Sequence, residues 1–354
     1  MRPSHIRAVL DREFASTASQ AHTPVMLWGP PGVGKSQIIA QIAAEHRVPL
    51  IDIRLSQMEP TDLRGVPFRK GDVVEWSVPS LLPDAVRHGA RGILFLDEIT
   101  SAPPTVTAAA YQLILDRRLG DYRVPPGWVI FAAGNRHGDR GVTYVMPTPL
   151  ANRFTHYDIE PDLEDWVAWA HGAGIDERII AFLRFRPDLL FAFDPAQSPV
   201  AFPSPRSWEY AHRALIKFSD VPHLLRDALQ ACVGQAAGVE CKAFLDHMGE
   251  LPDIEAILQG GSEPVPQAID LQYGVAAALV RRAIQARDMP HAKVVYGNIL
   301  RYATRFPQRE MGVMLVTDMH RSVGKPLFAV PEFAAWASSI TDLMLYDLGL
   351  ASRQ

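Results

Sequence analysis

Several residue types that mark common protein classes are scarce in this chain of 354 residues. Cysteine occurs only twice, at Cys232 and Cys241, which is too few for a disulfide framework and has no metal-ligand spacing with a nearby histidine. The 12 histidines are scattered and form no H-x-x-x-H or similar pattern, so no metal site of that kind is predicted. We expect both thiols to be reduced, in a cytoplasmic protein.

Long apolar runs and an excess of basic charge are also missing. No stretch of 18 or more apolar residues occurs, so we expect no membrane span. Arg2 and Arg7 do not precede a long apolar run, so no signal peptide is predicted. The formal net charge of −4 gives no general electrostatic footprint for nucleic acid. The 48% of hydrophobic residues is ample for a large core, and the length suggests two domains.

The most informative feature that is present is Gly-Pro-Pro-Gly-Val-Gly-Lys-Ser at residues 29–36, a full G-x-x-x-x-G-K-[ST] loop. Residues 24–28 read as a buried strand and residues 36–45 as a helix whose N-terminus would face an anion. In such a loop, backbone amides approach phosphate oxygens, the lysine reaches the β- and γ-phosphates and the hydroxyl ligates Mg²⁺. We therefore predict that a nucleoside triphosphate is bound by Gly29, Pro30, Pro31, Gly32, Val33, Gly34, Lys35, Ser36 and Gln37.

A second acidic element lies at residues 92–98, where an apolar run ends in two carboxylates. A continuous apolar run is typical of a central parallel strand, and the carboxyl end of such a strand is where an open α/β sheet places ligands. We expect Asp97 to hold Mg²⁺ through its water shell, together with Ser36, and Glu98 to orient or deprotonate the attacking water. The alternative is an exposed acidic pair at a helix start.

Three further motifs place single polar side chains. Residues 131–135 predict a buried strand that ends in Asn135, whose amide could hydrogen-bond the attacking water or the γ-phosphate. Arg153 lies in Pro-Leu-Ala-Asn-Arg-Phe at 149–154, and Arg206 lies in the first turn of a helix that opens at 203–208. Taken alone, Asn135 could be a turn residue and both arginines could be surface residues, Arg153 pairing with Asp158 or Glu160.

Together these motifs resemble those of the AAA+ ATPases, and among them the MoxR family, over roughly residues 1–235. The resemblance rests on GPPGVGKS, LFLDEITSAPP at 94–104, AAGNR at 132–136, PLANRF and PSPRSW. It implies a parallel-sheet P-loop core followed by a helical lid, and Mg²⁺-dependent ATP hydrolysis. By the same resemblance Asn135 looks like sensor 1, Arg153 like the arginine finger that acts on ATP in the neighbouring subunit, and Arg206 like sensor 2.

The resemblance also implies partners. It implies a homo-oligomeric ring, expected as a hexamer, with a von Willebrand factor A domain protein as adaptor. The implied task is chaperone-like remodelling or maturation of a protein target, and CbbQ-type proteins are relatives within the family.

The chain is expected to divide into an α/β part and a helical part. Residues 1–159 alternate strand and helix patterns, with a second strand at 49–53 and a short helix opening at 59–65. From residue 160 onward helical patterns dominate. We predict a lid at 160–239 and an extension or continuation of the lid at 240–354, with helices at 163–170, 177–185, 207–218, 222–235, 268–285, 293–305 and 331–348.

The sequence leaves the role of two predicted hairpins and of one apolar helix face open. The hairpin predicted at 67–78 resembles the helix-2 insertion of MoxR proteins, and a second pattern runs over 118–126; both could be ordinary surface hairpins. Trp76 could contact substrate or lie in the core. The apolar face of the last helix could be core or a docking surface; it comprises Phe333, Trp336, Ile340, Leu343 and Met344.

Two other function classes remain open at this point. A nucleic-acid motor would need a basic, aromatic-lined pore, whereas the 67–78 hairpin carries Arg69 and Lys70 but also Asp72 and Glu75. A nucleotide-gated assembly scaffold with little turnover would not need both carboxylates and the candidate finger, which are all present.

Overall fold

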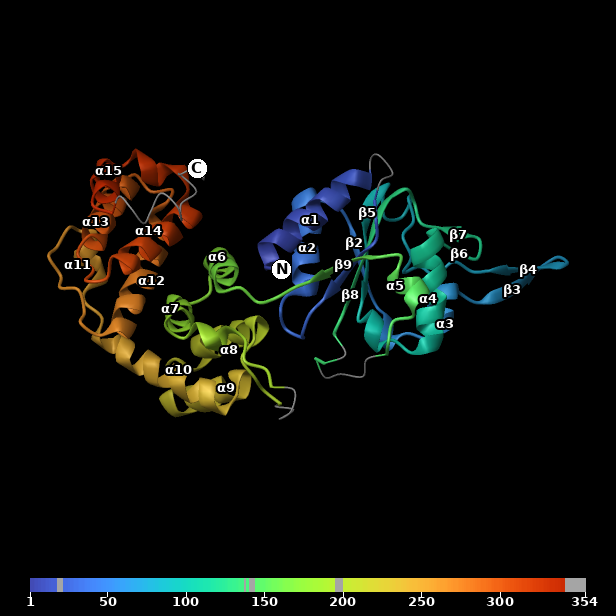
Figure 1. Cartoon of the computed structure of the whole chain (residues 1–354), viewed down its shortest axis with the longest axis horizontal. Helices are drawn as coiled ribbons and strands as arrows, with labels where there is room; N and C mark the ends of the chain where they lie inside the picture. Colours follow the sequence, from blue (N-terminus) through green and yellow to red (C-terminus); the bar gives the residue numbers. More distant parts are fainter. Residues whose placement is uncertain (18–21, 137, 140–143, 195–199, 341–354) are drawn as a thin grey trace. The chain divides into compact units, whose positions relative to one another are not determined.

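The computed structural model describes residues 1–17, 22–136, 138–139, 144–194 and 200–340. The chain divides into two compact units, Met1–Asp162 with Asp194–Ser198, and Leu163–Phe193 with Pro199–Gln354 (Figure 1). In the described residues the first unit is α/β and the second is helical, so the predicted fold class is confirmed. The further division predicted at residue 239 stays a prediction.

The first unit is built on a five-stranded parallel sheet in the order β2-β5-β8-β1-β9. Its strands are β1 (Val25–Trp28), β2 (Leu50–Arg54), β5 (Arg91–Asp97), β8 (Gly127–Gly134) and β9 (Thr155–Asp158). The two strands β5 and β8 are buried along nearly their whole length, which explains why their sequences are continuous apolar runs. All four predicted strands of this sheet are present, and their carboxyl ends meet at one edge.

Helices cover the sheet and bury apolar faces at helical spacing. They are α1 (Pro3–Ser16), α2 (Lys35–His46), α3 (Pro60–Arg64), α4 (Pro104–Asp116) and α5 (Thr148–Ala151), with the short 3-10 turns η2 (Leu55–Gln57) and η3 (Ile99–Ser101). In α4 the buried residues Val106, Ala109, Ala110 and Leu113 follow the i, i+3, i+4, i+7 pattern. They pack into a cluster with apolar side chains of β5 and β8, which anchors the helix on the sheet.

Two antiparallel hairpins leave the sheet, as predicted. The longer one, β3 (Pro67–Lys70) and β4 (Val73–Trp76), projects from the α/β unit (Figure 1), and the shorter pairs β6 (Arg118–Leu119) with β7 (Tyr122–Arg123). Gly65 fixes the base of the longer hairpin because its φ is +83° and a Cβ there would lie 1.7 Å from the carbonyl oxygen of Ser77. Trp76 is 43% exposed, so the interpretation of this residue as core is wrong.

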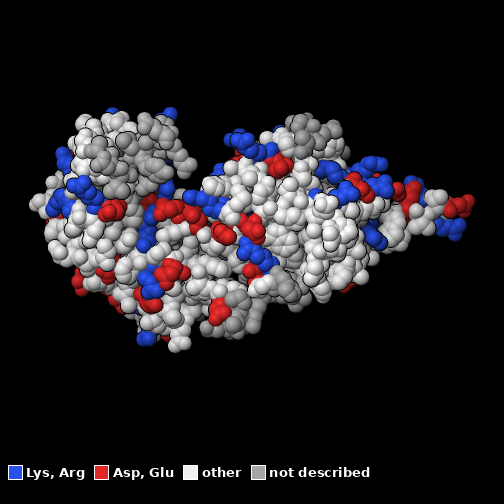
Figure 2. All heavy atoms as spheres, viewed as in Figure 1, with Lys and Arg blue, Asp and Glu red and all other residues white. Residues whose placement is uncertain are grey.

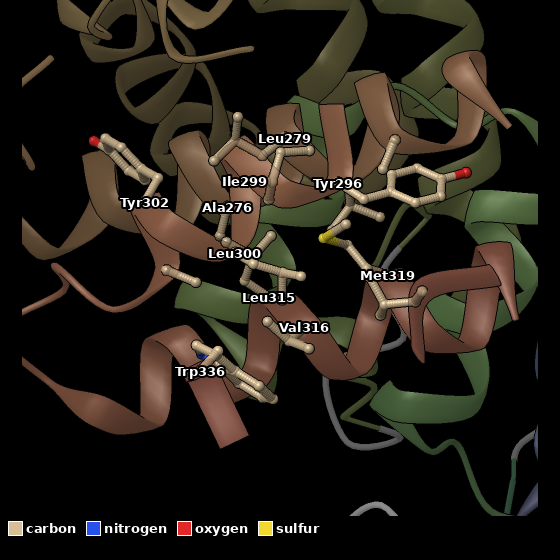
Figure 3. Packing of buried hydrophobic residues seen from close by; sticks show 14 of the residues in the cluster. Ala276, Leu279, Tyr296, Ile299, Leu300, Tyr302, Leu315, Val316, Met319 and Trp336 are labelled. Carbon is tan, nitrogen blue, oxygen red and sulfur yellow. The ribbon is translucent and has the colours of Figure 1, made fainter. Parts of the chain in front are cut away.

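The second unit contains ten α-helices among its described residues. They are α6 (Leu163–Ala173), α7 (Glu177–Phe185), α8 (Pro205–Phe218), α9 (Pro222–Val233), α10 (Gln235–His247), α11 (Ile254–Leu258), α12 (Ile269–Ala286), α13 (Ala292–Ala303), α14 (Arg309–Val323) and α15 (Pro331–Ser338). One cluster packs mainly residues from α6 to α10, and a second packs residues from α11 to α15 (Figure 3). Helix α12 contributes side chains to both clusters and so joins them.

The last described residues show whether part of the apolar face of the final helix is core or a docking surface. Trp336 and Ile340 are buried within the second cluster, and Phe333 packs against it, so these three residues are core. Leu343 and Met344 lie outside the described residues, as does the predicted helix beyond residue 340. Cys232 and Cys241 are both free thiols, and burial raises the pKa of Cys241 well above its ordinary value.

Candidate active site

The glycine-rich loop connects β1 to α2 with a geometry that only glycine adopts easily. Gly32 and Gly34 have φ of 84° and 91°, in the left-handed region. Gly34 is the N-cap of α2, and no side chain caps the helix there. A Cβ on Gly34 would meet no atom within 4 Å, so the loop is open on that side. An uncapped helix N-terminus beside an open loop suits an anion.

The buried lysine of the loop meets the end of a second predicted motif. The Nζ of Lys35 donates to the carbonyl oxygens of Gly29 at 2.6 Å and Pro30 at 3.0 Å. It also donates to Oδ1 of Asn135 at 3.1 Å, although 100 residues separate them in the sequence. All three of these acceptors are neutral oxygens, and none of them is a carboxylate.

Ser36 and Asp97 bring the loop and the acidic strand together. The Oγ of Ser36 donates to Oδ2 of Asp97 at 2.8 Å, and the other carboxylate oxygen accepts the backbone N–H of Glu98 at 2.8 Å. Asp97 is buried at the end of β5. A hydroxyl beside a carboxylate offers the oxygen ligands that Mg²⁺ prefers.

Glu98 is held in an uncommon backbone conformation by its surroundings. Its φ of 56° and ψ of 32° lie in the left-handed region, which is sparsely populated for non-glycine residues and is often found at functional sites. Its Oε2 accepts a hydrogen bond from the hydroxyl of Ser56, which lies in η2 directly after β2. Sequence reasoning missed Ser56, and its position just after a strand neighbouring β5 was the available signal.

A third carboxylate adds to the negative charge at this edge of the sheet. Burial raises the pKa of Asp52, the negative charges of Asp97 and Glu98 raise it further, and Arg54 opposes them. Concentrated negative charge favours a divalent cation. Among the described residues, however, no group of three or more His, Cys, Asp or Glu side chains could hold a metal by itself. A bound Mg²⁺ would therefore need phosphate and water oxygens as further ligands.

The backbone of Asn135 is clamped by a residue that sequence reasoning also missed. Its N–H donates to Oγ1 of Thr100 at 3.1 Å, and that hydroxyl donates to the carbonyl of Asn135 at 3.3 Å. Thr100 is buried in η3, three residues after Asp97. A Cβ on Gly134 would lie 2.7 Å from the same hydroxyl, so a glycine is needed there for this close approach.

Arg153 lies outside this hydrogen-bonded group. It follows α5, its side chain is exposed, and it forms no side-chain hydrogen bond or ion pair with any described residue. The pairing considered for a surface arginine is not formed, because Asp158 pairs with Arg136 at 2.8 Å. Glu160 instead lies 3.9 Å from the N-terminal amine.

Arg206 lies in the helical unit. It is the second residue of α8, a helix whose N-cap Ser204 forms a reciprocal capping box with Ser207. Its side chain is exposed and has no hydrogen-bond partner among the described residues. The structure thus brings the loop, Asp97, Glu98 and Asn135 together within the first unit, where Arg153 forms no hydrogen bond with them, whereas Arg206 belongs to the second unit.

Comparison with known families fits this geometry. The family model described as "AAA domain (dynein-related subfamily)" matches residues 24–154, a range that contains the loop, both carboxylates, Asn135 and Arg153. Residues 24–154 thus match an AAA domain, and the chain is similar to relatives from the MoxR family of AAA+ ATPases. The predicted resemblance is confirmed.

Three curated relatives of this AAA+ chain illustrate the likeness. It is 28% identical to Protein NorQ of Paracoccus denitrificans over 46% of this chain and 62% of that protein. It is 26% identical to Denitrification regulatory protein NirQ of Stutzerimonas stutzeri over 48% of this chain and 64% of that protein. It is 28% identical to Protein CbbQ of Hydrogenophilus thermoluteolus over 43% of this chain and 60% of that protein. The chain thus spans less than two thirds of each relative's length.

None of the helices in the described ranges has both the length and the apolar composition that crossing a bilayer requires.

Proposed function

We propose that this AAA+ chain binds ATP with Mg²⁺ and hydrolyses it in a homo-oligomeric ring, a hexamer. The observation that carries the proposal is the meeting of Lys35 with Asn135 at 3.1 Å and of Ser36 with Asp97 at 2.8 Å, beside the uncapped N-terminus of α2. Three sequence motifs that are far apart in the chain supply these four residues. Their arrangement matches what triphosphate binding needs on chemical grounds.

The residues present fit ATP and Mg²⁺. The loop from Gly29 to Gln37, with its open amides and Lys35, would bind the phosphates, and Ser36 with Asp97 would hold the metal. When bound, Mg²⁺ would neutralise part of the phosphate charge. Glu98 would orient the attacking water and accept its proton, which requires its carboxylate to leave Ser56. Asn135, fixed by Thr100, would help to orient that water.

Arg153 and Arg206 would act from outside this group. An arginine supplied to a phosphoryl-transfer site from a neighbouring subunit is worth about 10³–10⁵ in rate. Both side chains are exposed and have no partner among the described residues, so no internal ion pair must be broken before either binds phosphate. We assign Arg153 to the ATP of the next subunit, and Arg206 to the γ-phosphate from the helical unit, which would act as a lid.

The work done by turnover is proposed to be remodelling or maturation of a protein target, with a von Willebrand factor A domain protein as adaptor. The β3–β4 hairpin supports a protein partner because its apolar side chains are exposed, with Phe68 at 46%, Val73 at 58% and Val74 at 65%. Its charges are of both signs, as Figure 2 shows at the projecting tip, and this does not favour nucleic acid. The name of the relative NirQ, a denitrification regulatory protein, fits a task of this kind.

The test is the ATPase rate per subunit against protein concentration, repeated with Arg153→Ala protein mixed into the wild type. A shared site predicts a rate that climbs with concentration and that falls more steeply than the fraction of wild-type subunits when the variant is added. Arg226→Ala is the matched control, because this arginine is also exposed and lies on α9. A rate that is independent of concentration and insensitive to Arg153→Ala would remove the finger and the ring from the proposal.

A further inference from the structure

A histidine ring connects the strand before the phosphate loop to the turn that carries Arg153. The Nε1–H of Trp28, the last residue of β1, donates to Nδ1 of His156 at 2.9 Å. Nε2 of His156 lies 2.7 Å from the carbonyl oxygen of Ala151, the last residue of α5. The two rings are stacked, with centroids 5.9 Å apart and planes at 21°. His156, which lies on β9, therefore connects β1 to the end of α5.

The donor chemistry allows only one protonation state to satisfy both contacts. An indole N–H can only donate, so Nδ1 of His156 must be an acceptor. A carbonyl oxygen can only accept, so Nε2 must carry the proton. The neutral Nε2–H tautomer makes both hydrogen bonds at once, and Trp28 thereby sets which nitrogen faces Ala151.

The carbonyl oxygen of Ala151 is a shared acceptor that closes the turn carrying Arg153. It accepts the backbone N–H of Phe154 at 3.1 Å as well as the ring of His156. Leu150 and Phe154 are buried in the core on either side of the turn, whereas Arg153 between them is exposed. The ring of Phe154 also meets His156 edge-on, with centroids 6.2 Å apart. Because α5 has only four residues, these contacts decide the direction in which Arg153 leaves the backbone.

The other end of the bridge lies at the phosphate loop of the same subunit. Trp28 directly precedes Gly29, whose carbonyl accepts Lys35 at 2.6 Å and whose N–H donates to Gly134 at 3.4 Å. The register pairs Trp28 with Gly134 on one side and with Asp158 on the other. A movement of Gly29 that displaces Trp28 would therefore be passed to His156 through the hydrogen bond between the two rings.

We propose that His156 is a positioning residue for Arg153, held in its working tautomer by Trp28. The bridge fixes the α5–β9 turn so that the guanidinium is presented to the neighbouring subunit, and it ties that presentation to the subunit's own phosphate loop. This inference rests on the proposed function, because Arg153 must first act as the finger. Misplacing a catalytic group by about 1 Å can cost about 10²-fold in rate, so a positioning residue has a measurable effect.

Three variants separate the ring from its hydrogen bonds. His156→Phe keeps a ring beside Trp28 and Phe154 but removes both nitrogens; we expect kcat to fall about tenfold with ATP affinity unchanged. His156→Gln offers one amide donor and one acceptor and is expected to recover turnover to within about threefold of wild type. Trp28→Phe removes the indole N–H that sets the tautomer and leaves a smaller ring beside His156, and its rate should lie between the two. His223→Phe, at an exposed position on α9, is the matched control.

The deciding measurement is a double-mutant cycle between His156→Phe and Arg153→Ala in the ATPase assay. If His156 acts through Arg153, the double variant turns over no more slowly than Arg153→Ala alone. In mixed rings His156→Phe subunits should slow wild-type partners, as Arg153→Ala subunits do. Additive effects, or a loss of ATP affinity in His156→Phe, would overturn the positioning role. A wild-type rate for His156→Phe while Arg153→Ala is slow would overturn this inference alone, whereas a wild-type rate for Arg153→Ala would overturn the finger itself.

Discussion

The two units of this chain hold their charged side chains in opposite ways. In the helical unit, Arg184 is buried and donates to Glu164 at 2.8 Å and to Asp318 at 2.6 Å, and Arg321 also donates to Glu164. Burial raises the pKa of Asp318 to about 6, although the positive charge of Arg184 opposes this. These bonds join α6, α7 and α14 and thus connect the two hydrophobic clusters.

In the AAA+ unit the charged groups of the candidate site are held by weaker or fewer partners. Lys35 donates to three neutral oxygens, Glu98 accepts one hydroxyl, and Arg153 pairs with no described residue. A buried charge matched by opposite charges is costly to disturb, whereas a charge held by neutral dipoles can be given to a ligand. The comparison indicates that the helical unit uses charge to fix its own structure and the AAA+ unit keeps charge available for chemistry.

Removing a charge from the AAA+ site should cost function rather than stability. We expect Lys35→Ala to lower ATP affinity by more than about 10²-fold, because the variant loses the cation that reaches the phosphates. Its thermal unfolding midpoint should stay within a few degrees of wild type, since the described bonds of Lys35 are to the neutral oxygens of Gly29, Pro30 and Asn135. Calorimetric titration with a non-hydrolysable ATP analogue and a thermal scan measure the two quantities.

Lys293→Ala, at an exposed position on α13, is the control for that experiment. Tight binding retained by Lys35→Ala would contradict the assignment of the loop. A large loss of stability would contradict the comparison instead, because Lys35 would then be a structural charge like Arg184.

Removing a charge from the helical unit should have the reverse effect. Arg184→Met leaves the buried Asp318 with only the more distant Arg321, at 3.9 Å, as a cation, and breaking a buried pair costs about 3–5 kcal/mol. We expect the unfolding midpoint to fall by roughly 10 °C. ATP affinity, measured below the transition, should change little because no group around Lys35 is altered.

A second substitution makes this prediction sharper. Arg184→Met combined with Asp318→Leu removes the buried carboxylate that has lost its main cation and should recover much of the lost stability. Arg226→Met is the exposed control on α9. If Arg184→Met leaves the midpoint unchanged, the network does not stabilise the unit and the contrast between the units fails.

The sequence predicted the main residues of the AAA+ site but not the hydrogen bonds that hold them in place. The loop, both acidic residues and Asn135 were predicted because each follows a strand whose apolar pattern is readable by itself, and parallel strands bring their carboxyl ends together. The positions of Ser56 and Thr100 depend on which strands are neighbours and on the path of η2 and η3. A local pattern shows that Ser56 follows a strand, but which strands are neighbours is tertiary information.

In the helical unit, too, contacts between distant residues could not be predicted from the sequence. Amphipathic spacing predicted seven of its described helices but missed α10, α11 and α14. The pair Arg184 and Asp318, the latter on α14, is separated by 134 residues. A sequence in which most arginines are surface residues does not reveal which one is buried. The bridge from Trp28 through His156 was missed for the same reason, since 128 residues lie between its two rings.

The hydrogen bond from Ser56 to Glu98 offers the finest test of the comparison. If the AAA+ unit keeps its charges available, the partner that holds Glu98 must be one that is easily given up. We expect Ser56→Ala to raise the basal ATPase rate by about fivefold, which is the value of about one hydrogen bond of ~1 kcal/mol, because the carboxylate no longer has to leave a partner before it meets water.

The rate is measured at saturating ATP, with Ser80→Ala as control because Ser80 is an exposed serine of the same unit. Glu98→Gln, with or without Ser56→Ala, should show no turnover, which would tie the effect to the carboxylate. A rate that falls in Ser56→Ala would mean that the hydroxyl places Glu98 for catalysis. Glu98 would then be a fixed charge like those of the helical unit, and only Lys35 and Arg153 would support the contrast.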